Sequence, residues 1–508
     1  MSRPHLPPSR RERFRWIIVA PVLILIALLA WAFASPVGAS PDDDYHLSSI
    51  WCGLGDRAGL CEPGDAPDER TVPGEVRESA ACYAMHSDRS AECQSDLWHE
   101  DPVSTDRGNF EGNYPPVYYG FMGLFASSDL QTSALVIRAV DALIFVGMTT
   151  ALYLLLPVRR RPTLVLSWMV TIVPFGMFLI ASDNPSGWAI LSGGTLWLAL
   201  VGWFEATNPR QRWLLGGVAV LAAVLGAGAR ADSATYNLVA IAAAVVLTFR
   251  MDRSYLLKAI LPIAIVVISL AFYFTTQQAA ASIAGLGNDN PVQGISTGML
   301  AFINFLNTPS LWQGVFGSWG LGWFDTALPA VVYVLGLASF AAIIFTGLRS
   351  MSWKKAIALL GVFSVVWLLP TYVLVQSRST VGQLVQPRYI LPLLVMGAGV
   401  ALFVVGSRAE ALTRVQSFLI GGGLTVTNAV ALHTNLRRYI TGADVNDWNL
   451  DRNIEWWWQL PLSPMAVWAI GSLAFAAAAY VLLREMRRTS YRAVVPVELR
   501  DEALPSGT

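Results

Sequence analysis

Three adjacent carboxylates, in the run Pro41-Asp42-Asp43-Asp44-Tyr45-His46, are the feature of the sequence best suited to chemistry. Adjacent carboxylates repel one another, so in a site of low dielectric at least one must take up a proton, pair with a cation or bind a metal. Asp42 or Asp43 could deprotonate an acceptor hydroxyl as a general base. The same two residues could instead supply oxygen ligands to a divalent cation such as Mg²⁺, Mn²⁺ or Ca²⁺. The competing interpretation is a solvated acidic turn.

Two further polar turns separate apolar segments of the chain. One is Asp183-Asn184-Pro185-Ser186 and the other is Arg230-Ala231-Asp232-Ser233. Either turn taken alone is typical of a helix cap or a tight connection. Because both are expected on the same side as the acidic run, we predict that Asp183, Arg230 and Asp232 support it.

Charged residues at or within the apolar segments form a third group. Arg388, in Gln386-Pro387-Arg388-Tyr389, precedes an apolar run. Its planar fork of donors suits a phosphate, although a lipid headgroup could occupy it equally well. Asp325 also precedes an apolar run and either caps the next helix or supports the site. Arg138 and Asp141 share a helix face, where they either pair with each other or face a cavity.

The composition indicates which elements position these residues. The chain has 508 residues, of which 54% are hydrophobic and 14% are charged, and its mean hydropathy is +0.49. A soluble domain of this size would expose more charge, so most of the chain is expected to contact lipid. The formal net charge is zero, which gives no reason to expect a nucleic-acid partner.

Apolar runs of about 20 residues predict an all-α integral membrane protein, a polytopic bundle of about 12 transmembrane helices. Seven clusters of basic residues at the ends of these runs all fall on one side, which the positive-inside rule assigns to the cytoplasm. We therefore predict a multi-pass protein of the bacterial plasma (inner) membrane with both termini in the cytoplasm. The predicted spans are 16–34, 134–156, 162–181, 186–204, 212–229, 235–249, 256–275, 326–347, 356–375, 389–406, 416–432 and 461–483.

This orientation places a large, partly structured first loop, residues 35–133, outside the cytoplasm. Within it, Tyr114–Phe121 is aromatic and broken by prolines, and it is too short to cross, so it indicates a re-entrant or interfacial segment. The remaining divisions are a cytoplasmic N-terminus at 1–15, membrane helices at 134–275 and 326–483, outer loops at 276–325 and 433–460, and a cytoplasmic tail at 484–508.

All four cysteines lie in the first loop, where an oxidising environment allows disulfides. Four cysteines can pair in three ways. The loop lengths favour Cys52–Cys61 and Cys82–Cys93. A zinc site is the rival interpretation, although the spacing contains no CxxC.

Five short motifs, in order along residues 36–400, resemble those of a bacterial family of predicted polytopic membrane proteins of unassigned function. The acidic run resembles the family's PDE-x-x-H signature, with Asp43 where the family usually has glutamate. The other four are Asp183–Gly187 (NPSG), Arg230–Ser233 (R-x-D-S), Gly322–Thr326 with Pro329 (GWLDT-x-LP) and Gln386–Tyr389 (Q-x-RY).

That family is similar to the GT-C superfamily of membrane glycosyltransferases, which take sugars from polyprenyl-phosphate donors outside the cytoplasm. The resemblance implies that Asp42 and Asp43 form the acidic pair, with Asp44 beside them and His46 as the motif histidine. It implies that Arg388 lies near the donor phosphate. We predict Arg230 as a second phosphate ligand and Tyr389 as a supporting residue.

We therefore predict transfer of a sugar to a cell-envelope glycan or glycoprotein. The basic residues are nearly all arginine, which is typical of an actinobacterium-like genome and keeps an arabinofuranosyl donor among the options. A transporter or flippase of a lipid-linked sugar is one alternative, which predicts paired half-repeats. A non-catalytic protein of envelope assembly is the other, which predicts that Asp42, Asp43 and Arg388 can be replaced without loss of phenotype.

Overall fold

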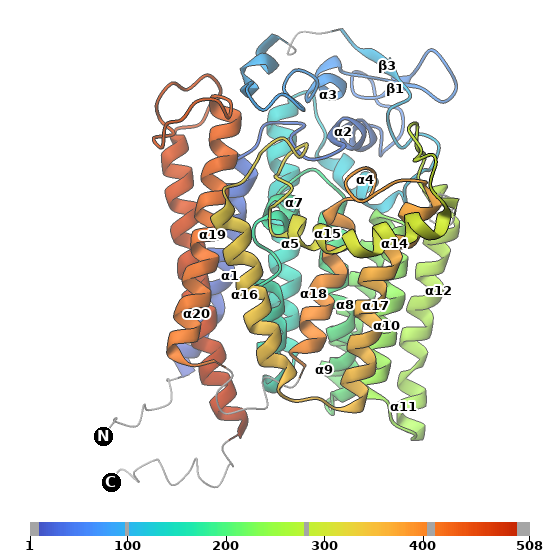
Figure 1. The fold of residues 1–508 in the computed structure, drawn as a ribbon, viewed down its shortest axis with the longest axis vertical. Coiled ribbons are helices and arrows are strands. Elements are labelled where there is room, and N and C mark those ends of the chain that lie inside the picture. The colour runs from blue at the N-terminus through green and yellow to red at the C-terminus, as the bar shows by residue number, and fades with distance from the viewer. Residues whose placement is uncertain (1–9, 97–100, 279–283, 404–411, 495–508) are drawn as a thin grey trace.

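Long apolar helices make up most of the structure. The computed structural model describes residues 10–96, 101–278, 284–403 and 412–494. In this part of the chain, eight helical segments are long and apolar enough to cross a membrane. They are α5 (Leu130–Leu155), α8 (Ser186–Glu205), α9 (Pro209–Ala229), α11 with α12 (Arg253–Lys258 and Ile260–Phe274), α16 (Ala330–Leu348), α17 (Trp353–Gln376), α19 (Arg414–Ile440) and α20 (Pro464–Val494) (Figure 1).

The predicted count of about twelve spans is confirmed only for these eight. Two other predicted spans, 235–249 and 389–406, correspond to shorter apolar helices, and the predicted span 16–34 corresponds to a 24-residue helix whose apolar part is Ile18–Phe33. These helices are α1 (Arg10–Phe33), α10 (Asp232–Thr248) and α18 (Leu391–Ala401), and residues 404–406 lie outside the described part of the chain.

The remaining predicted span, 162–181, is wrong as a single helix. It contains α6 (Arg161–Met169), which follows the 3₁₀ turn η3 (Val158–Arg160), and α7 (Phe175–Ile180). Pro174 lies between the two helices. Proline lacks the backbone N–H and disfavours helical geometry at the residue before it, so an apolar run that contains it breaks here.

The centre of the bundle is α8, which is buried over its whole membrane-spanning length. Such a helix is apolar on every face because other helices surround it. Both α10 and α18 pack against α8. The contact with α18 is close because α8 has glycine there: a Cβ at Gly193 would lie 2.6 Å from the Cβ of Pro392. The first turn of α18 therefore packs closely against α8.

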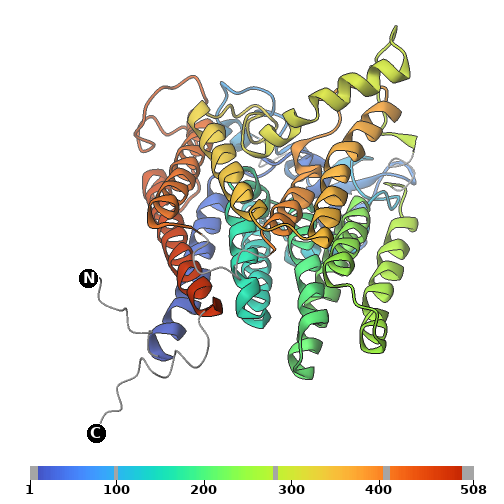
Figure 2. The same cartoon turned by 60° about the horizontal axis from the view of Figure 1, so that its bottom comes forward.

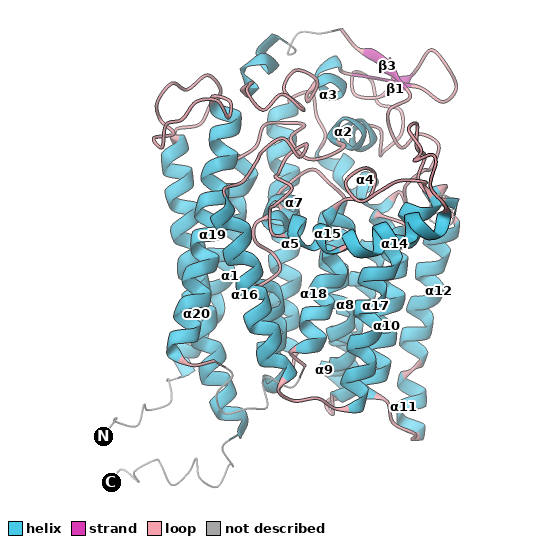
Figure 3. Cartoon of the chain, in the orientation of Figure 1, coloured by secondary structure: helices cyan, strands magenta, loops and turns pink. Residues whose placement is uncertain are grey.

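The loop between α1 and α5 covers one end of this bundle (Figure 3). It contains α2 (Asp43–Trp51), α3 (Gly74–Glu78), α4 (Val117–Met122), η1 (Ala91–Asp96) and η2 (Gly123–Phe125). It also holds a small antiparallel sheet of β1 (Glu62–Pro63), β2 (Arg70–Val72) and β3 (Val103–Thr105), in the order β1-β2-β3. Within the predicted interfacial segment Tyr114–Phe121, the chain forms α4, which packs against α2 and α9.

Two further predicted loops contain more helix than the sequence indicated. Segment 276–325 contains α14 (Thr297–Asn307) and α15 (Pro309–Val315), while α19 extends to Ile440 and shortens the predicted loop 433–460. The predicted tail 484–508 begins as helix, because α20 continues to Val494. The first turn of α1 and the last turn of α20 lie at the end of the bundle opposite the covering loop (Figures 1 and 2).

Candidate functional site

The Asp42 carboxylate and the Arg388 guanidinium form an ion pair, although 346 residues separate them in the chain. Arg388 also donates hydrogen bonds to the carbonyl oxygen of Pro41 at 3.0 Å and to the hydroxyl of Tyr389 at 3.3 Å. The Arg388 side chain is fully buried, whereas the Asp42 side chain is 35% exposed. An accessible carboxylate therefore lies directly on a buried cation.

The N-terminal ends of three central helices bring these residues together. Before α8, Asn184 donates a hydrogen bond to the carbonyl of Pro41 at 2.8 Å. On α10, the Tyr236 hydroxyl donates to the carbonyl of Tyr389, just before α18, at 2.6 Å. The unpaired N–H groups and the dipole at a helix N-terminus favour an anion. Three helices that begin at one place therefore create a region suited to negative charge.

Arg230 is the second buried guanidinium of this region. It forms a two-pronged ion pair with Asp232, at 2.8 and 3.0 Å, and lies over the rings of Tyr389 and Tyr114 at 5.0 and 5.6 Å. Burial lowers the pKa of the Arg230 guanidinium, but the charge and hydrogen bonds of Asp232, together with Tyr114 and Tyr389, outweigh burial and raise the pKa well above its usual value. Since the guanidinium of Arg388 lies 5.2 Å from the same Tyr389 ring, two permanent cations flank one aromatic side chain.

The three adjacent aspartates have three different environments because α2 begins between them. Asp42 has a left-handed backbone with φ of 63° and precedes the first residue of α2. Aspartate tolerates this conformation better than most residues. Asp42 pairs with Arg388 and Asp43 points inward to Ser40. Asp44 pairs with Arg107, whose Nε lies 2.7 Å from the carboxylate.

Asp43 is completely buried and bound by the turn that precedes it. The backbone N–H of Ser40 donates to its carboxylate at 2.8 Å, and the Ser40 hydroxyl donates to the other oxygen. Burial, and next the charge of Asp183, raise the pKa of the Asp43 carboxyl to about 8, against the opposing effects of Ser40 and Arg138. Its side chain does not reach the surface, so in this structure it cannot contact an acceptor.

The raised pKa of Asp43 predicts a pH-dependent stability. The folded protein holds the Asp43 proton up to about pH 8, whereas the unfolded chain releases it near pH 4, so the stability from this group falls as pH rises between those values. Because asparagine does not titrate, the melting temperature of the Asp43→Asn variant should fall less than that of the wild type as the pH rises from about 5 to about 8. Thermal unfolding followed by tryptophan fluorescence measures this.

The exposed residue Asp289 provides the control for that experiment. Asp289→Asn should keep the wild-type dependence of melting temperature on pH. An Asp43→Asn variant with the same slope as the wild type would show that Asp43 is ionised in the folded protein.

His46 is also fully buried, and aromatic side chains surround it. Its Nδ1 lies 2.9 Å from the hydroxyl of Tyr119, and its ring stacks on Tyr119 and meets Tyr114 edge-on. Burial lowers the pKa of the imidazole well below its usual value, so the ring is neutral. Its Nε2 has no hydrogen-bond partner among the described residues. His46 therefore offers an uncharged ring beside Asp42.

Asp183 lies behind the aspartate run and pairs with Arg138, for which the sequence had offered Asp141 as a partner. Arg138 on α5 donates to Asp183 at 2.8 Å and to the carbonyls of Ser35 and Pro36 at 2.6 and 2.7 Å. The alternative in which Arg138 pairs with Asp141 is therefore wrong. Asp141 instead accepts a hydrogen bond from the Trp188 indole at 2.6 Å. Arg138 fixes the segment that leads from α1 to Asp42.

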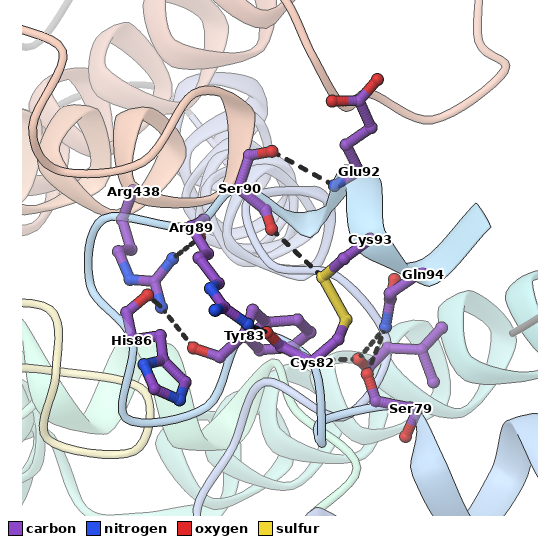
Figure 4. The surroundings of a disulfide bond; sticks show 11 residues. Ser79, Cys82, Tyr83, His86, Arg89, Ser90, Glu92, Cys93, Gln94 and Arg438 are labelled. Carbon is purple, nitrogen blue, oxygen red and sulfur yellow. Dashed lines mark hydrogen bonds between the residues drawn. A yellow bond between two sulfur atoms is a disulfide. The ribbon is translucent and has the colours of Figure 1, made fainter. Parts of the chain in front are cut away.

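Asp325 is not in contact with the Asp42–Arg388 pair. It forms an ion pair at 2.8 Å with Arg438, near the end of α19, and the next helix, α16, begins only at Ala330, so Asp325 does not cap it. Arg438 also binds the carbonyl oxygens of Tyr83, His86 and Arg89 (Figure 4). These contacts join α19 to the first loop.

Both predicted disulfides, Cys52–Cys61 and Cys82–Cys93, are confirmed. The second closes the segment that Arg438 binds (Figure 4). Gln94, next to Cys93, donates hydrogen bonds to the carbonyls of Val37 and Ser79 at 2.8 and 2.7 Å. The disulfide-closed segment is thus connected to the linker that carries Asp42.

The arrangement does not suit a metal ion. The Asp42 carboxylate is occupied by Arg388, and a guanidinium nitrogen of Arg107 lies 3.8 Å from its other oxygen. Within the described ranges, no group of three or more His, Cys, Asp or Glu side chains could hold a metal ion. A divalent cation at Asp42 and Asp43 would face these guanidinium charges, so the site favours an anion instead.

The sequence pointed to Asp42, Arg388, Arg230, Asp232 and Tyr389, and the structure brings these five together. The sequence did not single out Arg107, because this residue belongs to none of the motifs. Only its contact with Asp44 in the structure identifies it. Nor did the sequence single out Tyr119, although the aromatic segment that contains it was noted as interfacial. Ser40 lies three residues before Asp43, a spacing that could have indicated a local turn.

Two crystal structures of an oligosaccharyltransferase from Archaeoglobus fulgidus are similar to this chain. The apo form has 13% identity and a TM-score of 0.38, covering 92% of this chain and 65% of that one. The form tethered to an acceptor peptide with the NVT sequon has 14% identity and a TM-score of 0.31, covering 95% of this chain and 56% of that one. The chain thus spans less than two thirds of their length, and at these scores the likeness says nothing about its activity.

The comparison with curated proteins gives no match. A family model described as a predicted membrane protein (DUF2142) matches residues 25–396, which include Asp42, both polar turns and Arg388. The chain therefore belongs to the DUF2142 family of predicted membrane proteins.

Proposed function

We propose that this protein is a membrane glycosyltransferase of GT-C type. It transfers a sugar from a polyprenyl-phosphate donor to a cell-envelope glycan or glycoprotein on the outer side of the plasma membrane. The observation that carries the proposal is the ion pair between Asp42 and Arg388. A carboxylate and a phosphate-binding group from distant parts of the chain are placed side by side, and the carboxylate remains accessible.

The donor phosphate binds to Arg388 and Arg230. The paired donors of a guanidinium match the oxygens of a phosphate. Both guanidiniums are buried and therefore fixed in position. These two fixed cations, together with the N-termini of α8, α10 and α18, favour the anionic donor.

Asp42 is the general base. It accepts the proton of the acceptor hydroxyl while the acceptor oxygen bonds to the anomeric carbon of the sugar. The bond between that carbon and the phosphate oxygen breaks, and the electron pair leaves with polyprenyl phosphate, whose charge Arg388 stabilises. Asp43 is buried, so its role is to hold the turn at Ser40 that orients Asp42.

Binding of the donor makes Asp42 a stronger base. Burial raises the pKa of its carboxyl, but the charge and hydrogen bond of Arg388, with smaller contributions from His46 and Arg107, together outweigh burial, and the pKa is lowered to about 2. A carboxylate with so low a pKa accepts a proton poorly. When the donor phosphate takes the N–H groups of Arg388, Asp42 loses this partner and its pKa rises. The base is thereby activated only when the donor is bound.

The test supplies radiolabelled polyprenyl-phosphate sugars to membranes that contain the protein. Donor-dependent transfer of label into an envelope glycan or glycoprotein is expected, and membranes without the protein serve as the control. Movement of the intact labelled lipid across the membrane without sugar transfer would instead identify a transporter. If none of the donor sugars is transferred, the proposal that this protein is a glycosyltransferase is contradicted.

A further inference from the structure

A cavity of about 650 Å³ lies between α1, α5, α6 and α20, at the end of the bundle opposite Asp42 and Arg388. Its volume is within the range of about 300–1,000 Å³ that is typical of ligand sites. Most of its wall is apolar, with Ala27, Phe145, Leu164, Phe475 and Ala478 among the lining residues. A lipid chain is the ligand that such a wall accommodates in a membrane.

One polar group in the wall lacks a partner. Trp168 lines the cavity and is only 6% exposed, and its indole N–H makes no hydrogen bond with the described residues. A buried donor without a partner is costly. The indole nitrogen is itself covered by protein atoms, so it does not contact a ligand in this structure.

The rim of the cavity carries an excess of positive charge. Arg161 lies over Tyr153 at 4.8 Å, donates to the carbonyls of Leu154 and Leu156, and forms no ion pair with a described carboxylate. Arg159 is 52% exposed and shares Glu205 with Arg160. Glu485 also lines the cavity. Of the charged residues that line the cavity, two are arginines and one is a glutamate, which favours an anionic headgroup over a neutral one.

We propose that this cavity binds an acyl chain of an anionic glycerophospholipid, with the lipid phosphate on Arg159 and Arg161. The positive-inside rule predicts that this end of the bundle faces the cytoplasm, where anionic lipids attract basic residues. The bound lipid joins α1 and α20 to the corner between α5 and α6. This site is separate from the proposed sugar-transfer site and does not depend on it.

The experiment titrates the purified, delipidated full-length protein with phosphatidylglycerol or phosphatidylcholine in detergent and counts bound lipids by native mass spectrometry. Phosphatidylglycerol should bind at least about 10-fold more tightly than phosphatidylcholine, and the double variant Arg159→Gln/Arg161→Gln should lose this preference, since each basic residue near an anionic headgroup contributes appreciably. Arg210→Gln/Arg253→Gln changes two exposed arginines that do not line the cavity, and should bind like the wild type.

A second variant tests the cavity itself without a change of charge. Ala478→Trp places a large side chain in the cavity and should reduce the bound phosphatidylglycerol, while the thermal unfolding curve reports whether the protein still folds. Equal binding of both lipids, equal effects of the two double arginine variants, or binding of palmitate as tight as that of phosphatidylglycerol would each overturn the proposal.

Discussion

Replacing Arg388 with glutamine is expected to reduce sugar transfer about 100-fold to 1,000-fold, which is the usual effect of removing one donor that stabilises developing negative charge. The Arg388 side chain is fully buried and lies on Asp42, so its fork of donors is fixed before the donor arrives. Initial rates of transfer from the radiolabelled polyprenyl-phosphate sugar, measured in membranes with matched amounts of protein, give the ratio.

Two further variants make this result specific. Arg388→Lys keeps the charge but loses the planar fork, so its rate should lie between those of the wild type and Arg388→Gln. Arg452, in a loop before α20, is 69% exposed on its side chain, and Arg452→Gln should transfer at the wild-type rate. If Arg388→Gln transfers sugar as fast as Arg452→Gln, Arg388 does not bind the phosphate.

The second large effect is expected for Asp42→Asn, which should lower the transfer rate about 100-fold to 10,000-fold because asparagine cannot accept the proton. Asp43→Asn should cost less, since Asp43 is buried and acts through the position of Asp42. The same assay measures both variants, and the exposed residue Asp289, as Asp289→Asn, is the matched control. Loss of transfer in Asp43→Asn but not in Asp42→Asn would exchange the roles of the two residues.

The dependence of the wild-type rate on pH shows whether Asp42 acts as a general base or only holds Arg388 in position. The profile of kcat/KM reports the free enzyme, in which the pKa of Asp42 is lowered to about 2, so no acidic limb should arise from Asp42 near neutral pH. The profile of kcat reports the complex with donor, in which Arg388 has exchanged its partner, so its acidic limb should shift to higher pH. If the two profiles had identical acidic limbs, the proposed transfer of Arg388 from Asp42 to the donor phosphate would be contradicted.

The long helices were predictable because apolar length alone identifies a membrane-spanning helix. The errors arose where local chemistry divides or shortens an apolar run. Pro174 interrupts the run from 162 to 181, and α18 ends at Ala401 although the apolar residues continue. The structure within the first loop was not predictable in detail, because its short strands and helices depend on contacts between distant segments, such as those of Arg438 with Tyr83 and Arg89.

The site was partly predictable for a different reason. Topology placed Asp42, Arg230 and Arg388 on one side of the membrane, and the resemblance to a family selected the same residues. The difference between the three aspartates was not predictable, because it depends on the residue at which α2 begins and on the left-handed backbone of Asp42. The contribution of Arg107 was hidden because 63 residues separate it from Asp44 and no motif connects them.

The distance along the chain between Asp42 and Arg388 has a consequence for biosynthesis. A ribosome completes the acidic run early, but the arginine that neutralises Asp42 is made 346 residues later. During that interval Asp42 has no contact with Arg388, and a chain that ends before that arginine keeps only Arg107 as a cation near Asp42. The proposed phosphate site is therefore complete only after 388 of the 508 residues have been made, so under the proposed function a product that ends earlier would not transfer sugar.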